Sequence, residues 1–338
     1  ISFFAGVWAD RYSRKMLIIL ADTVIAVATA MLFFAMPGIS GDAVLLGALL
    51  VLSIIRSLGA GVQTPAVSAV IPQLVPEEHL MRCNGIHATM QSVVQFAAPA
   101  VAGAVLSVGT FRSALLIDIL TALLGIGLLS CVLLPKQEAS GEQMAVFSEI
   151  KAGIRYSFSD RMIGKTLTVY GLFILLSVPA GFMAALLVSR VYGDAYWYLT
   201  AVELVGFAGM VLGGVVMGIW GGFKSRVKTF AVGLLVLSVM TMGMGMSPYF
   251  LLYLAMMFVY SVALTVIQTA VTTIIQERSE SAMQGRVFGL MGAMYSGFLP
   301  VGMAIFGPLA DLMPLQWIMV GSGIALVFVT AVLQAKAD

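Results

Sequence analysis

Long apolar runs constrain this chain more than any other feature of its sequence. Stretches of about 20 residues recur with almost no charge, and a helix of that length crosses the hydrocarbon core of a bilayer. Hydrophobic residues make up 60% of the 338 residues and charged residues only 10%, whereas soluble domains carry about 25% charged residues. We therefore predict an all-α integral membrane protein. Ten complete spans are expected, at residues 16–36, 43–64, 86–108, 113–134, 166–188, 197–221, 229–247, 249–273, 287–310 and 315–334.

The remaining composition argues against several other classes of protein. A net charge of +2 is too small to predict nucleic-acid binding. Two cysteines and two histidines are too few for a disulfide framework or a metal centre. We find no nucleophile–base set and no phosphate-binding loop in the sequence, so we expect no enzyme activity, no metal and no bound cofactor.

The first apolar stretch, ISFFAGV at residues 1–7, is too short to cross a bilayer. Because the chain begins with Ile rather than Met, we expect it to be truncated at its N-terminus. Such a truncation would leave the first span and most of the second missing.

The distribution of Lys and Arg predicts the orientation of the chain in the membrane. Alternate loops, beginning with GVWADRYSRK at residues 6–15, hold most of the 18 Lys and Arg residues, whereas the opposite loops hold only Arg112 and Arg190. Positively charged loops of multi-pass proteins face the cytoplasm. We therefore expect a plasma-membrane protein whose central loop and C-terminus are cytoplasmic.

The longest polar stretch divides the chain into two halves. Apolar residues recur in it at helical spacing, which predicts an amphipathic helix at the membrane surface, at Val146, Ile150, Ile154 and Phe158. We expect three regions, namely a truncated N-terminal transmembrane half at residues 1–134, a cytoplasmic linker at 135–165 and a C-terminal transmembrane half at 166–338.

A short pattern recurs in the two halves. Gly6-Val-Trp8 and Ser13-Arg14 match Gly218-Ile-Trp220 and Ser225-Arg226 at a constant offset of 212 residues. Each copy falls between the second and third spans of its own half, once the missing first span is counted. Parallel repeats of six spans are typical of transporters whose halves rock around a central site. We therefore predict two six-helix repeats and a transport function.

The first copy, GVWADRYSRK, resembles the G-x-L-A-D-R-x-G-R-K loop motif of the major facilitator superfamily, with Trp8 in place of Leu and Ser13 in place of Gly. RSLGAGVQTPA, LLIDILTALL and VELVGFAGMVLGG are similar to the macrolide-efflux branch of its drug–proton antiporters. The resemblance implies a latch that shuts the cytoplasmic side, with Asp10 facing the positive start of the helix at Gly285-Arg286. The alternative is a set of ordinary positive-inside residues. The residues implied in the latch are Gly6, Asp10, Arg11, Arg14 and Lys15.

Four charged residues fall inside predicted spans, where charge is expensive and usually functional. Asp22 and Arg56 lie at similar depth on adjacent spans, which permits an ion pair, either a switch or a fixed structural pair. Glu203 is the first choice for proton coupling or for contact with a cationic drug, because a desolvated carboxyl takes up protons more readily. The alternative is an acid that faces lipid headgroups. Asp118 lies on a span that the resemblance places at the periphery, so we expect a structural role there.

Polar and amphipathic residues on the predicted cavity spans are candidates for binding a large apolar substrate. They are Gln91, Gln95, Tyr170, Tyr253, Tyr260, Gln268 and Tyr295.

The resemblance implies proton-coupled efflux of amphipathic, macrolide-like drugs by alternating access, with the proton gradient as energy source and no cofactor. We expect a monomer whose partners are a small amphipathic molecule, protons and the bilayer. Siderophore export, lysophospholipid movement and a non-transporting membrane sensor are the alternatives.

Overall fold

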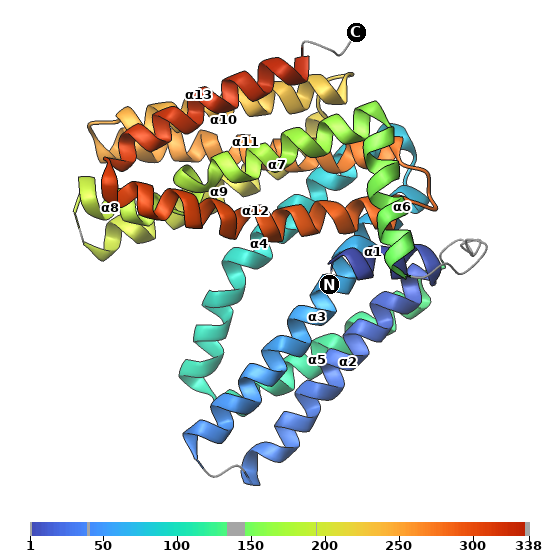
Figure 1. The fold of residues 1–338 in the computed structure, drawn as a ribbon. Coiled ribbons are helices and arrows are strands. Elements are labelled where there is room, and N and C mark those ends of the chain that lie inside the picture. The colour runs from blue at the N-terminus through green and yellow to red at the C-terminus, as the bar shows by residue number, and fades with distance from the viewer. Residues whose placement is uncertain (1, 39–40, 134–145, 194, 335–338) are drawn as a thin grey trace. The chain divides into compact units, whose positions relative to one another are not determined.

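The computed structural model describes residues 2–38, 41–133, 146–193 and 195–334. In this described part the regular structure is helical, and a single 3-10 turn, Met36–Gly38, follows the second helix. In chain order the helices (Figure 1) are α1 (Ser2–Arg11), α2 (Arg14–Ala35), α3 (Asp42–Leu74), α4 (Glu77–Val108), α5 (Phe111–Cys131), α6 (Val146–Ser159), α7 (Arg161–Gly181), α8 (Ala184–Val191), α9 (Tyr196–Trp220), α10 (Arg226–Met246), α11 (Phe250–Arg278), α12 (Gln284–Leu312) and α13 (Leu315–Gln334).

The apolar runs become the long helices, which confirms the predicted all-α membrane class. Within the described residues, nine helical stretches are long and apolar enough to cross a bilayer, and α13 adds a shorter apolar stretch, Leu315–Ala331. α7 and α8 together make one of these stretches, Arg161–Val191. The break between them comes shortly after Pro179, whose missing N–H weakens the helix. All ten predicted spans fall on helices.

The helices group into two compact units that do not follow the two halves of the sequence. Unit 1 comprises Ile1–Leu74, Phe96–Tyr156 and Ser279–Ala293, and unit 2 comprises Val75–Gln95, Ser157–Arg278 and Met294–Asp338. Three helices are therefore divided between the units. Unit 1 takes the start of α6 and of α12, and unit 2 takes the start of α4.

In unit 1, α2 packs against both α3 and α5, and α1 packs against α3. One apolar cluster joins these helices near the loop between α1 and α2, and it contains Ala9, Leu17, Ile18 and Ala66. In unit 2, α10 packs against α11 and α13, α11 packs against α9, and α13 packs against α7. Both units thus bury helix faces against neighbours, while many large apolar side chains elsewhere stay exposed, as a membrane protein requires.

The internal repeat of the sequence is also a repeat of local structure. The Arg14 guanidinium donates to the Ala9 carbonyl (3.2 Å), and at the 212-residue offset the Arg226 guanidinium donates to the Gly221 carbonyl (3.4 Å). A serine directly before α2 and before α10 caps each helix through its side chain. The two loops therefore fold alike, each with an arginine that turns back onto the helix before it.

Candidate functional site

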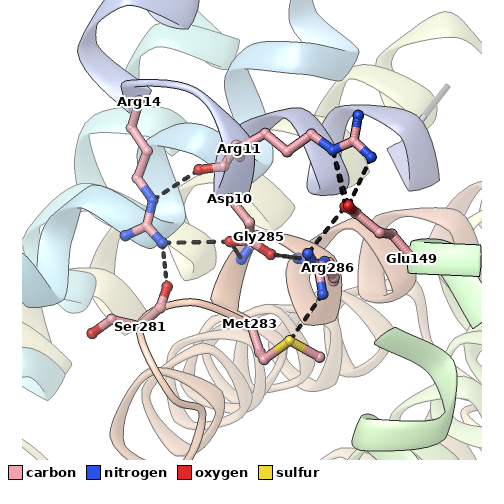
Figure 2. Close-up of polar contacts among 9 residues, drawn as sticks. Asp10, Arg11, Arg14, Glu149, Ser281, Met283, Gly285 and Arg286 are labelled. Carbon is pink, nitrogen blue, oxygen red and sulfur yellow. Dashed lines mark hydrogen bonds and ion pairs between the residues drawn. The ribbon is translucent and has the colours of Figure 1, made fainter. Parts of the chain in front are cut away.

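Asp10 caps the N-terminus of α12 with both carboxylate oxygens. Oδ1 accepts the backbone N–H of Gly285 (2.8 Å) and Oδ2 accepts that of Arg286 (3.0 Å), as Figure 2 shows. The first N–H groups of a helix have no partner inside the helix and carry partial positive charge, so a carboxylate is favoured there. The structure thus brings together the two groups that the loop motif suggested. That they act as a latch stays a prediction.

Glycine at two positions permits this approach of α1 to α12. A Cβ at Gly285 would lie 2.5 Å from the carbonyl oxygen of Gly6 and 2.6 Å from Asp10 Oδ1, and a Cβ at Gly6 would overlap the backbone of Gly285. Side chains have no room between these backbones. Gly6 therefore lies where α1 and α12 approach closely, as its predicted role requires.

Arg14 is buried and holds three segments together. Its guanidinium donates to the backbone carbonyls of Ala9 at the end of α1, Ala69 on α3 (2.5 Å) and Ser281 in the loop before α12 (2.6 Å). It also lies 3.5 Å from Asp10 Oδ1. A buried arginine is tolerated when its donors are satisfied in this way.

Lys15 has a different place from the other predicted latch residues. Its ammonium donates to the carbonyls of Ser130 and Val132, both at 2.7 Å, at the C-terminal end of α5. The last carbonyls of a helix attract a cation in this position. Lys15 therefore joins α2 to α5 and is not part of the contact with α12.

Glu149, on α6, completes the cluster and was not predicted. Its carboxylate accepts from Arg11 (Nη2, 2.7 Å; Nε, 3.1 Å) and from Arg286 Nη2 (3.0 Å), so it lies between the two guanidinium groups in Figure 2. The sequence did contain a hint of this role. Glu149 is the acidic residue of α6 and lies away from the apolar residues of that helix. We call Asp10, Arg11, Arg14, Glu149 and Arg286 the Asp10 cluster.

Burial raises the pKa of Asp10 from 3.8 to about 6, because desolvation outweighs the N–H groups of Gly285 and Arg286 and the charges of Arg14 and Arg286. The closed arrangement therefore binds a proton more tightly than one in which Asp10 is exposed to water. Acidification through about pH 6 should favour the closed contact, and a rise of pH through that value should weaken it.

We expect the alkylation rate of a cysteine at Ser279 to fall when the pH is lowered from about 7.5 to about 5.5. Ser279 lies in the loop before α12 and is 7% exposed. Each rate is divided by that of the denatured protein at the same pH. Asp10→Asn should remove this pH dependence and raise the rate, because its amide would point N–H donors at N–H donors. Asp311→Asn, at an exposed ion pair, is the control. A dependence that survives Asp10→Asn would contradict the assignment.

The second copy of the motif has no acid at the position that corresponds to Asp10. Gly222 occupies the position of Asp10, and the Thr229 hydroxyl accepts the neighbouring N–H of Phe223 (2.9 Å). A Cβ at Gly85 on α4 would lie 2.5 Å from the amide nitrogen of Gly218 on α9. Close glycine packing is therefore shared by both copies, whereas the charged contact differs, because Arg226 pairs with Glu277 on α11 (3.0 Å).

A buried amide reinforces this second contact. Asn84 Nδ2 donates to the Thr273 hydroxyl (2.9 Å) and to the side-chain carbonyl of Gln276 on α11. All three side chains are buried. The start of α4 is thus tied to α11 by neutral hydrogen bonds.

The predicted ion pair between Asp22 and Arg56 is wrong. Arg56 instead pairs with Asp118 on α5, at 2.6 and 3.1 Å, and the Thr29 hydroxyl donates to the same carboxylate (3.1 Å). Asp22 accepts from the side-chain amide of Gln63. Distance along a helix predicts depth in the membrane but not the direction of a side chain around the helix axis, and depth was the only argument for the pair.

These polar residues of unit 1 border one cavity of about 560 Å³. Asp22, Arg56, Gln63 and Asp118 all lie on its wall. Asp118 therefore has the structural partner that its predicted role required, and that partner is Arg56.

A larger cavity, of about 640 Å³, lies within unit 2. Its wall is mostly apolar and aromatic, and Glu203 is the one charged side chain among the described lining residues. Glu203 has an exposed side chain on this wall, and its role in proton coupling stays a prediction. Such a cavity suits an amphipathic ligand, because apolar walls with a few polar groups bind large molecules and orient them.

Five of the seven predicted substrate residues line this cavity, namely Gln91, Gln95, Tyr260, Gln268 and Tyr295. The other two lie elsewhere. The Tyr170 hydroxyl donates to the side-chain carbonyl of Gln268 (3.2 Å) from outside the cavity wall. Tyr253 is buried and packs against the ring of Tyr192. Tyr170 therefore supports a lining residue, and contact of any of the seven with substrate stays a prediction.

Comparison with known proteins agrees with this architecture. The sequence is 27% identical over 320 residues to macrolide efflux protein A of Streptococcus pyogenes, which covers 90% of this chain and 76% of that protein. It is 25% identical over 325 residues to the multidrug efflux pump Tap of Mycobacterium tuberculosis, covering 91% and 74%. The human organic anion transporter MFSD10 has a similar fold, with a TM-score of 0.81 and 14% identity over 98% of this chain and 80% of its own. The family model of the Major Facilitator Superfamily matches residues 1–299. The chain belongs to the Major Facilitator Superfamily.

Proposed function

We propose that this transporter exports amphipathic, macrolide-like compounds from the cytoplasm in exchange for protons. The observation that carries the proposal is the cavity of unit 2, with its mostly apolar wall and the carboxylate of Glu203. An amphipathic cation would bury its apolar surface there and place its charge near Glu203. The efflux proteins to which the chain is similar support the direction of transport.

The proposed cycle alternates access between the two sides of the membrane. Two contacts join helices of different sequence halves at the end of the helices that the Lys and Arg pattern places in the cytoplasm. In the first contact, Asp10 of α1 caps the N-terminus of α12. In the second, Gly85 of α4 packs against Gly218 of α9. In the proposal both contacts close the cytoplasmic side, and both open when substrate enters. The energy comes from the proton gradient, and no bound cofactor is required.

Glu203→Gln tests the coupling. The amide has nearly the same shape as the protonated acid but cannot release a proton. We expect the variant to lose uphill efflux and its dependence on the proton gradient, while exchange of substrate down its own gradient continues. Both are measured side by side in vesicles loaded with a labelled macrolide. Glu78→Gln, exposed at the start of α4, is the matched control.

The same experiment separates the rival substrates. A lipid transporter driven by its substrate's own gradient would tolerate Glu203→Gln and would move labelled lysophospholipid in the same vesicles. If the protein exports siderophores, unlabelled siderophore should inhibit its transport and unlabelled macrolide should not. Full proton-driven macrolide efflux by Glu203→Gln would contradict the assigned role, and coupling would then fall to Asp22, Arg56 or Asp118 in unit 1.

A further inference from the structure

α6, the helix of the central linker, is attached to the Asp10 cluster along one face. Glu149 binds Arg11 and Arg286, and Gly153, one turn later, lies beneath the Arg286 side chain, where a Cβ would come within 2.8 Å of Arg286 Cβ. The Tyr156 hydroxyl accepts the backbone N–H of Glu280 (3.0 Å) in the loop before α12. Three residues spaced along one helical face thus contact the segment that begins α12.

The opposite face of α6 is apolar and exposed. Phe147 is 77% exposed and Phe158 is 52% exposed. Of the apolar residues predicted in the linker, Ile154 and Phe158 lie exposed on this face. Phe147 also packs edge-on against Phe4 of α1 (6.0 Å between ring centroids).

The burial of Glu149 has an electrostatic reason. The residue is 4% exposed, and a carboxylate is buried at such a site only when it is paired. Arg11 lies on α1 and Arg286 on α12, and both lie within 3.1 Å of this one carboxylate. Without the acid, two cations from two different helices would face each other. Approach of α1 to α12 therefore draws on the charge of Glu149 as well as on that of Asp10.

We infer that α6 is a strap across the cytoplasmic closure, in which Glu149 positions Arg11 and Arg286 and is released from at least one of them when α1 and α12 separate. The central linker is then a moving part of the transport cycle and not a passive tether between the halves. This inference rests on the proposed alternation of access, but its test requires no transported substrate.

The test measures how often the closure opens. Ser279 is replaced by Cys in a background where Cys83 and Cys131 are replaced by Ser, and inside-out vesicles are treated with a membrane-impermeant maleimide. We expect Glu149→Gln to raise the alkylation rate of Cys at position 279 by about tenfold, because it removes the negative charge that lies between the Arg11 and Arg286 guanidinium groups. Arg155→Gln, on the exposed face of α6, is the control and should leave the rate unchanged.

Two further variants show whether the effect acts through the charge. Glu149→Asp keeps the charge and should restore a rate near that of the parent protein. Arg11→Gln should also raise the rate, and the double variant with Glu149→Gln should be no faster than the faster single variant. Fully additive effects, or a Glu149→Asp variant as fast as Glu149→Gln, would overturn the inference. An unchanged rate in Glu149→Gln together with a raised rate in Asp10→Asn would remove α6 from the closure but leave the Asp10 contact intact.

Discussion

Gly285→Ala is expected to hold α1 and α12 apart and to abolish uphill efflux. The added methyl group would meet the backbone oxygen of Gly6 and the carboxylate of Asp10, and neither can move without breaking the cap on α12. Overpacking of this kind costs about 1–3 kcal/mol, which shifts the balance between closed and open forms by roughly 5- to 150-fold. Energised efflux and the alkylation rate of Cys at position 279 report the two consequences.

Gly297 provides the matched control on the same helix. A Cβ at Gly297 would have no atom within 4 Å, so Gly297→Ala should leave both efflux and alkylation as in the parent protein. A Gly285→Ala protein that is present in the membrane in normal amount and still performs full efflux would show that this close approach is not needed in the cycle.

Neutralising either member of the pair Arg56–Asp118 is expected to impair the protein, and exchanging the two residues should restore part of the loss. Each single change leaves one charged side chain without an opposite charge beside it inside a membrane span. The loss of a charged hydrogen bond with an unsatisfied partner costs about 1–3 kcal/mol. Arg56→Gln and Asp118→Asn should lower the amount of folded protein in the membrane and its thermal stability, and the exchange Arg56→Asp with Asp118→Arg should recover some of both.

Asp22→Asn is the control for this pair. Asp22 accepts from the Gln63 amide and borders the same cavity, but it makes no ion pair with Arg56. Its amide variant should therefore keep near-normal stability. Strictly additive damage in the exchanged double variant, or rescue of Arg56→Asp by Asp22→Arg, would contradict the observed pairing.

The positions of the spans were predictable from the sequence, because lipid requires about 20 apolar residues for each crossing helix. The repeat of GVWADRYSRK and GIWGGFKSRVK also predicted a repeated structure, which the matching contacts of Arg14 and Arg226 confirm. These features follow from periodicity and composition, which the chain displays locally.

Pairing between side chains was much less predictable. Asp22 and Arg56 matched in depth, but Asp118 lies on the side of α5 that faces Arg56, and the rotation of each helix about its axis depends on packing with its neighbours. Tyr170 and Tyr253 lie on helices that border the cavity but are not among the residues that line it, for the same reason.

Glu149 illustrates a second limit, which is distance along the chain. It binds Arg11 over 138 residues of separation and Arg286 over 137, and α6 could turn any of its faces toward unit 1. The apolar pattern of α6 was what the sequence showed, whereas its contacts with the start of α12 are made by Glu149, Gly153 and Tyr156. A single sequence gives no information about such a choice between faces.

The order of synthesis sets when the charged end of unit 1 can be completed. The α12 partner of Asp10 lies 275 residues further along the chain, and the Ser281 carbonyl that Arg14 binds lies 267 residues further. α1, α2 and α3 leave the ribosome long before either partner exists, and unit 1 is complete only when Ala293 has been made. Until then, these two charges must remain hydrated at the membrane surface. Their burial is therefore a late docking event that follows insertion of the helices. In a nascent chain halted before α12, Asp10 and Arg14 would stay exposed to water.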